Sequence, residues 1–241
     1  AAYDDRGWHR TGAFGIFGAT AAAGKLLGLT QEKMIHAFGI AYSQSAGNRQ
    51  CIIDGALTKR FQAGQAAHGA VLSVFLANEG FTGAENVFAG KYGFFPMYQD
   101  GGYDLSVISN GLGEEFLGDR ISLKPYPCGR PTHSYIDAGI KLHQELQLDR
   151  TSIKSIVVHT DSDADSSQYS ISSGVVNPQQ QVEAQFSLPY LISCALVLGK
   201  VGIDQINAFN DPKVLATASI IRAERKDGMP KGQTELVVTC D

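Results

Sequence analysis

The feature that most constrains the fold of this chain is a change of sequence pattern near residue 118. Residues 13–112 read as a succession of Ala- and Gly-rich segments with helical spacing, and small residues let helices approach closely. Beyond that point, β-branched runs such as Ile156-Val157-Val158 and Glu235–Cys240 alternate with helical segments. The pattern predicts a mostly α-helical domain over residues 1–118 and a smaller α+β domain over residues 119–241.

Three long helices are expected in the first half, over Ala13–Leu27, Thr30–Ser45 and Gln62–Asn78. The hydroxyl of Thr30 can cap the second of them. Thr82-Gly83-Ala84-Glu85 has the capping-box pattern and predicts a short fourth helix, whereas 91–104 is expected to be loop.

In the second half, Asp119–Leu123 alternates polar and apolar residues like a strand, and Val182–Gly199 is expected to be a helix. Gly228–Gly232 is expected to be the loop of a hairpin. The chain stops within the last expected strand, and Gly7-Trp8-His9 comes almost at its start. We therefore expect an excerpt of a larger polypeptide whose second domain is truncated at its C-terminal end.

Composition narrows the function classes. A 44% hydrophobic content supports a substantial core, and a net charge of −4 without a run of Lys or Arg argues against nucleic acids and anionic membranes. The longest apolar stretch, 13–29, contains Lys25 and four glycines, so no membrane span is expected. Acidic residues stand where a signal peptide would be basic, which favours the cytoplasm or an organelle matrix.

The four cysteines favour free thiols over a metal site. Cys51, Cys128, Cys194 and Cys240 are far apart, with neither a C-x-x-C pair nor a histidine at zinc spacing. Neither zinc nor an iron–sulfur cluster is expected. Asp161–Asp165 resembles half of a calcium loop but lacks the glycine and glutamate that complete one.

The densest group of reactive side chains follows the change of pattern. Lys124-Pro125-Tyr126-Pro127-Cys128, with Arg130 and His133 close behind, combines cations, a phenol, a thiol and an imidazole. Prolines restrict their own φ and the residue before them, so a rigid turn would display Lys124, Tyr126 and Arg130. The alternative is an ordinary connection with solvated polar groups.

His9 and Lys59 are further candidates. His9 precedes the first expected helix, whose N-terminal amides could help to bind a carboxylate; a histidine that caps local backbone is the alternative. Lys59 is expected between helices beside Arg60, where its pKa could be lowered enough for proton transfer, although a surface lysine is the simpler interpretation. No G-x-S-x-G elbow, P-loop or strand-linked G-x-G-x-x-G occurs.

Several motifs, dispersed over the chain and in the same order, resemble the MmgE/PrpD family. They are Gly7-Trp8-His9, Thr58-Lys59-Arg60 with Ala66-Ala67-His68, Gly80-Phe81-Thr82-Gly83, Lys124-Pro125-Tyr126-Pro127-Cys128 with His133, and Ala184-Gln185-Phe186-Ser187-Leu188-Pro189-Tyr190. The resemblance implies an all-helical domain with an α+β lid, a homodimer, and a site between the domains that needs neither a metal nor an organic cofactor.

The same resemblance implies chemistry on small polycarboxylates. The family includes 2-methylcitrate dehydratase, cis-aconitate decarboxylase and iminodisuccinate epimerase. By similarity, His9, Lys59, Lys124 and His133 are the catalytic candidates, with Tyr169 as a further site residue that binds substrate. Arg130 and Tyr126 of the Pro-rich turn are also expected to bind substrate, and which group acts as the base stays open. Dehydration of an acid such as 2-methylcitrate is the first expectation; epimerisation, decarboxylation and a non-catalytic interaction module remain alternatives. The N-terminal part of the family's helical domain has no counterpart here.

Overall fold

The computed structural model describes residues 7–99, 103–146, 153–160, 175–230 and 233–240. Two compact units emerge, a first unit of Ala1–Cys51 with Leu57–Ile121 and a second unit of Ile52–Ala56 with Ser122–Asp241. Tyr169 and the acidic loop Asp161–Asp165 lie outside the described residues.

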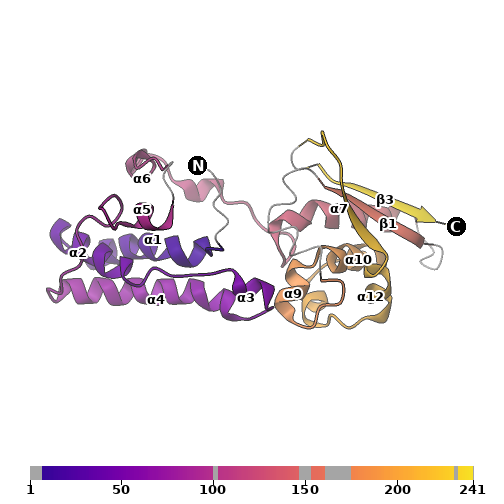
Figure 1. Ribbon diagram of the computed structural model, residues 1–241, viewed down its shortest axis with the longest axis horizontal. Coiled ribbons are helices and arrows are strands. Elements are labelled where there is room, and N and C mark those ends of the chain that lie inside the picture. Colours follow the sequence, from indigo (N-terminus) through magenta and orange to yellow (C-terminus); the bar gives the residue numbers. More distant parts are fainter. Residues whose placement is uncertain (1–6, 100–102, 147–152, 161–174, 231–232, 241) are drawn as a thin grey trace. The chain divides into compact units, whose positions relative to one another are not determined.

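The first unit is helical. Its elements are α1 (Arg10–Leu27), α2 (Gln31–Tyr42), α3 (Gln50–Ile53), α4 (Thr58–Asn78), α5 (Phe94–Tyr98), α6 (Ser106–Ser109) and the 3₁₀ helix η1 (Leu117–Arg120), with α3 running across the division into the second unit. Helices α1, α2 and α4 pack against one another (Figure 1). Thr30 caps α2 as expected, because its hydroxyl accepts a hydrogen bond from the Lys33 amide.

Small residues set the packing distance in this unit. Ala13, Ala41 and Ala70 are almost fully buried beside Ile16 and Phe94. Alanine at such positions lets helix backbones approach closely without leaving cavities.

The short fourth helix expected after Thr82 is wrong. The backbone of Gly83 lies against Gly39 of α2, so close that a Cβ added at Gly39 would lie 2.5 Å from the Gly83 carbonyl carbon. The chain between Phe81 and Gly90 therefore follows α2 in an irregular conformation, and the loop expected over 91–104 contains the short helix α5 instead.

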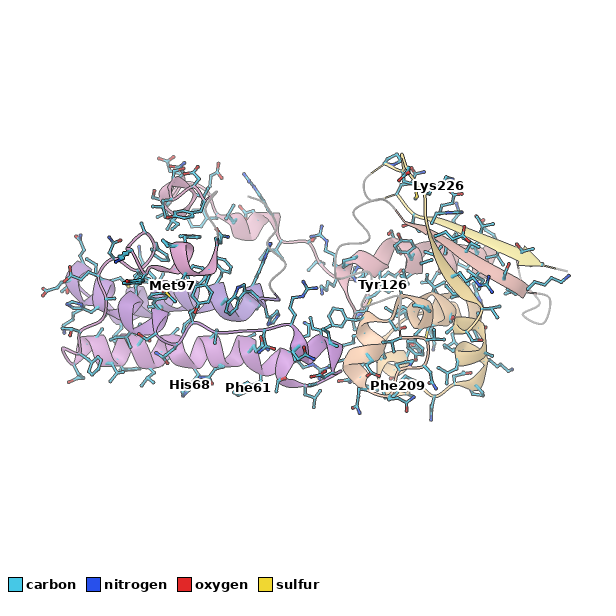
Figure 2. The ribbon with its side chains drawn as sticks, viewed as in Figure 1. Phe61, His68, Met97, Tyr126, Phe209 and Lys226 are labelled. Carbon is cyan, nitrogen blue, oxygen red and sulfur yellow. The ribbon has the colours of Figure 1, made fainter. Side chains whose placement is uncertain are left out.

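The outer face of α4 is apolar. Phe61 and Phe75 are 62% and 55% exposed, and Leu72 is also exposed. Figure 2 shows Phe61 and His68 together on this side of the helix, pointing away from α1. The face is wide enough to be covered by another helix.

The second unit combines helices with a small sheet. Its elements are the 3₁₀ helix η2 (Arg130–Thr132), α7 (His133–Leu146), β1 (Ile153–Thr160), α9 (Gln181–Phe186), α10 (Leu188–Leu198), α11 (Ile203–Asn207), α12 (Pro212–Ala218), β2 (Ile221–Arg225) and β3 (Glu235–Cys240). Strand β1 lies in the middle, parallel to β2 and antiparallel to β3, and Ile156 pairs with both Ile221 and Val238.

One face of the sheet is buried under α7 and α10. Ile156 and Val158 of β1 contact Tyr135 of α7 and Ile192 of α10. Helix α10 is the core element of this unit, because its residues from Leu188 to Val197 are all buried. Figure 1 shows α10 beneath α7 and the sheet.

Three expectations for this half are wrong in detail. Asp119–Leu123 contains the end of a 3₁₀ helix and no strand, since alternation over five residues without a pairing partner does not make one. Strands β2 and β3 do not form a hairpin, because β1 lies between them. The helix expected over 182–199 is divided at Ser187, which caps α10.

The mostly helical domain and smaller α+β domain predicted from the sequence are confirmed as a fold class. Within the described ranges, no helix combines the length and the apolar character that a membrane crossing requires.

Candidate functional site

His9 is the N-cap residue of α1 and is held by the neighbouring strand-like segment. Trp8 and Asn48 form an isolated antiparallel bridge. The His9 amide donates to the Gly47 carbonyl over 3.3 Å, and the Arg49 amide donates to the Gly7 carbonyl over 2.8 Å. These bonds fix the backbone of His9 against the loop that precedes α3.

Gln62 of α4 holds the ring of His9. Its Oε1 lies 2.7 Å from His9 Nδ1 and accepts a hydrogen bond from the Asn48 amide at 3.1 Å. Its Nε2 donates to the Asn48 carbonyl at 3.0 Å and lies 3.3 Å from Cys51 Sγ. Four contacts therefore fix one glutamine side chain beside the imidazole.

Two cations act on this histidine. Burial lowers the pKa of His9 most, and the charges of Lys59 and Arg49 lower it further, while the contact with Gln62 raises it. Arg49 is itself buried, at 7% exposure. The group combines a histidine that favours its neutral form with two fixed positive charges, an arrangement suited to an anion.

Lys59 does not lie between helices as expected. Helix α4 begins at Thr58, four residues earlier than the pattern indicated, and Lys59 is in its first turn. This placement puts Lys59 and Gln62 on neighbouring positions of one helical face, because residues three apart lie on the same side.

The Pro-rich turn forms a second group, in the second unit. Lys124 Nζ donates to the Cys128 carbonyl at 3.1 Å, which folds the turn back on itself. The hydroxyl of the buried Thr132 donates to the Gly129 carbonyl at 2.8 Å and lies 3.3 Å from Cys128 Sγ. Burial raises the pKa of the Cys128 thiol, so this sulfur favours the neutral form and is a poor nucleophile.

His133 is the first residue of α7. Burial lowers its pKa most, followed by the charge of Lys124, whereas a backbone hydrogen bond with Cys128 raises it. Its ring meets that of Tyr126 edge-on, with 5.4 Å between centroids. Nε2 of His133 is buried and has no hydrogen-bond partner within the described part of the chain.

Tyr126 is tied to the same helix. Its hydroxyl donates to Asp137 Oδ1 at 2.5 Å. Burial and this carboxylate raise the pKa of Tyr126 to about 12. Arg130, in η2, adds a charge that lowers the pKa of His133. Tyr126 is labelled in Figure 2, where it lies beside α7.

The structure thus brings Lys124, Tyr126, Arg130 and His133 together in the second unit. In the first unit it brings Lys59 close enough to His9 to affect its pKa. Tyr169, the remaining candidate, is not among the described residues.

Three polar residues of these groups are absent from the sequence prediction. Asp137 stands four positions after His133, which on a helix means the same face, so spacing could have found it. Gln62 becomes visible once α4 is known to begin at Thr58. Nothing in the sequence points to Arg49, which only the bridge beside His9 brings into place.

Outside these two groups of residues, a site could lie in a further groove or in a group of metal ligands. A surface groove of about 710 Å³ in the second unit is lined by residues of α10 to α12, among them Lys200, Asp204 and Lys213, and includes none of the predicted site residues. Among the described residues, no three His, Cys, Asp or Glu side chains are grouped so that they could hold a metal ion.

Comparison with known proteins matches two domain models of one family to this chain. Residues 1–105 match the MmgE/PrpD N-terminal domain, and residues 126–239 match the MmgE/PrpD C-terminal domain. The chain belongs to the MmgE/PrpD family.

Curated relatives are similar over much of the chain. It is 30% identical to a cis-aconitate decarboxylase of Aspergillus terreus over 217 residues, 86% of this chain and 44% of that protein. It is 27% identical to the human cis-aconitate decarboxylase over 230 residues, 90% of this chain and 45% of that protein. A cis-aconitate decarboxylase-like protein, oryM, of Aspergillus oryzae is 34% identical over 145 residues, 58% of this chain and 30% of that protein. The chain therefore spans less than half the length of these relatives.

Proposed function

We propose that the protein of which this chain is part is a lyase that acts on a small tricarboxylate, with cis-aconitate as the first candidate. The observation that carries the proposal is that each unit places a histidine of lowered pKa beside a lysine, His9 with Lys59 and His133 with Lys124. Cations bind carboxylates, and a histidine near neutrality can move a proton. The similarity to cis-aconitate decarboxylases supports the choice of substrate.

Decarboxylation of cis-aconitate calls for cations that bind carboxylates and for an acid that supplies a proton. The bond between the methylene carbon and its carboxylate breaks, carbon dioxide leaves, and the released electron pair forms a new terminal double bond. The electrons of the old double bond take up a proton at the far carbon, giving a methylene-succinate. Lysines stabilise the negative charge that develops on the remaining carboxylates, and a histidine that has taken up a proton from solvent on its free ring nitrogen delivers it to the far carbon.

Dehydration of 2-methylcitrate is the second candidate, because the same groups could perform it. A neutral histidine would remove a proton beside a carboxylate, hydroxide would leave, and a second acid would protonate it to water. Epimerisation of an acid such as iminodisuccinate would return the proton to the opposite face without a net elimination.

One experiment separates these reactions. Proton NMR of the full-length protein in heavy water, with each acid in turn, would follow alkene signals, and a separate assay would follow carbon dioxide. Terminal-methylene signals with carbon dioxide from cis-aconitate would support the proposal. An alkene from 2-methylcitrate without carbon dioxide would favour dehydration, and exchange of a carbon-bound proton alone would favour an epimerase.

Variants test the residues. Lys59→Ala and His133→Ala should each lower turnover by about 10²-fold or more, since a positioned acid–base group contributes roughly 10²–10⁴. Matched controls are Lys25→Ala in the last turn of α1 and Lys141→Ala, whose partner Glu145 is also on the exposed side of α7. Near-wild-type turnover in Lys59→Ala and His133→Ala would show that these residues do not carry the reaction. No turnover and no binding of any acid by the wild type would leave a non-catalytic interaction module as the better account.

We also propose a homodimer in the cytoplasm or an organelle matrix, with neither metal nor organic cofactor in the reaction. Light scattering of the purified protein measures its oligomeric state. Turnover that survives extensive chelation would support a reaction without a metal. Turnover that is lost on chelation and restored by a metal would contradict it.

A further inference from the structure

We propose that Gln62 is a positioning residue that fixes His9 as the tautomer protonated on Nδ1, so that Nε2 carries the lone pair used in proton transfer. The use of that lone pair in proton transfer rests on the proposed function. The tautomer itself follows from geometry alone.

The orientation of the Gln62 amide follows from its neighbours. The Asn48 backbone N–H can only donate, and it lies 3.1 Å from one end of the amide; the Asn48 carbonyl can only accept, and it lies 3.0 Å from the other. The end that faces the N–H must therefore be the oxygen, and the end that faces the carbonyl must be the nitrogen. A flipped amide would oppose donor to donor and acceptor to acceptor.

That orientation decides the protonation of the ring. The oxygen fixed in this way lies 2.7 Å from His9 Nδ1, a distance that requires a hydrogen between them. Because a carbonyl oxygen has no hydrogen to give, Nδ1 must carry it. A neutral imidazole has one N–H, and Nε2 is left as the basic nitrogen.

The surroundings keep the histidine neutral and the glutamine in place. The charged groups that act on His9 are Lys59 of α4 and Arg49 of the loop before α3, and both disfavour a second proton on the ring. Gly47 leaves room for this arrangement, since a Cβ at its position would lie 2.9 Å from the His9 carbonyl oxygen and 3.1 Å from Gln62 Oε1. The arrangement resembles other sites in which a second residue sets the tautomer of an acid–base histidine.

The test reads the tautomer directly. The full-length protein, labelled with ¹⁵N-histidine, is studied by two-bond ¹H–¹⁵N correlation at about pH 8, and the His9 signals are assigned by their loss in His9→Gln. The variants are Gln62→Met, which removes the acceptor, and Gln62→Glu, which keeps an oxygen facing Nδ1. Gln44→Met is the matched control, because Gln44 bonds Ser73 and the Ile40 carbonyl and contacts no histidine in the described structure.

The expected result is an Nδ1–H pattern for His9 in the wild type, Gln44→Met and Gln62→Glu, and its partial or full replacement by Nε2–H in Gln62→Met. Gln62→Glu should also raise the protonation midpoint of His9, because a carboxylate favours the imidazolium. We expect kcat to fall about 10- to 100-fold in Gln62→Met, a part of what a positioned acid–base group contributes. Recovery in Gln62→Glu should be partial, because its second oxygen opposes the Asn48 carbonyl.

An Nε2–H pattern in the wild type, or an unchanged tautomer in folded Gln62→Met, would overturn the inference. The NMR result decides it even if the protein converts none of the acids, in which case the proposed function fails and the positioning role stands or falls by itself. If turnover occurs and Gln62→Met changes neither tautomer nor kcat, the function stands and the inference fails.

Discussion

The hydroxyl of Tyr126 donates a hydrogen bond to Oδ1 of Asp137 across 2.5 Å and so ties the Pro-rich turn to α7, one helical turn after His133. The bond holds the segment that carries Lys124 against the helix that carries His133. After burial, it is also what raises the pKa of the phenol, because ionised Tyr126 would lose a donor and face a carboxylate.

Replacing Asp137 by Asn should lower the pKa of Tyr126 below its value of about 12, since burial and the smaller effect of Cys128 still oppose the phenolate but the charge of the carboxylate no longer does. The measurement is a pH titration of tyrosine Cζ by ¹³C NMR, with Tyr126→Phe to assign the signal. Tyr126→Phe should also reduce the free energy of unfolding by about 0.5–1.5 kcal/mol. An unchanged midpoint in Asp137→Asn would mean that the carboxylate does not act on the phenol.

Gly47→Ala should destabilise the first unit and disturb His9. Gly47 has a φ of 149°, where L-residues are strained, and a Cβ there would lie 2.9 Å from the His9 carbonyl oxygen and 3.1 Å from Gln62 Oε1. We expect a loss of about 1–3 kcal/mol in the free energy of unfolding, measured by urea denaturation.

The matched control is Gly18→Ala, in the middle of α1. A Cβ at Gly18 meets no atom within 4 Å, and the residue is helical and exposed. This variant should gain about 0.5–1 kcal/mol from helix propensity. Equal effects of the two substitutions would refute the local explanation for Gly47.

Two fully buried serines, Ser187 at the start of α10 and Ser193 within it, should respond differently to replacement by alanine. Ser187 caps the helix, because its oxygen accepts from the Tyr190 amide at 3.1 Å, and its hydroxyl also donates to the Val175 carbonyl. Ser187→Ala should cost about 1–3 kcal/mol in stability, from the lost cap and a partly buried carbonyl left without its donor.

Ser193 is equally buried, but its hydroxyl has no hydrogen-bond partner in the part of the chain that the structure describes. Ser193→Ala should therefore be neutral or stabilising. Denaturant unfolding of both variants gives the comparison, and a larger loss for Ser193→Ala would show that its hydroxyl is satisfied after all.

Sequence reasoning found the parts of this fold that depend on local pattern. Val157 and its neighbours form β1, and Thr30 caps α2, since β-branched runs and capping side chains act over a few residues. It failed where tertiary contacts decide. The close approach of Gly83 to Gly39 prevents a helix that the capping pattern favoured, and β1 comes between two strands expected to pair.

The same limit applies to the candidate site. Lys124 and His133 were found because a short Pro-rich segment holds them together in the sequence. Arg49 approaches His9 through a bridge between segments forty residues apart, and no local signal encodes that meeting.

The pH dependence of stability should depend in part on His133. Burial, and then the charge of Lys124, lower the pKa of His133 below its ordinary value of 6.5. The unfolded chain therefore binds the proton more tightly than the folded one. Stability from this group is fully present above about pH 6.5 and is lost as the pH falls through the folded pKa.

His133→Gln should consequently lose less stability than the wild type between pH 7.5 and 5. Urea unfolding at several pH values measures the difference, with His68→Gln as control, because His68 is exposed on the outer face of α4. Lys124→Met tests the cause: without that charge, the pKa of His133 should rise, and proton NMR of the imidazole would record the higher midpoint. If His133→Gln keeps the full pH slope of the wild type, the lowered pKa does not contribute to stability, and the neutral form of His133 must be explained by something other than burial beside Lys124.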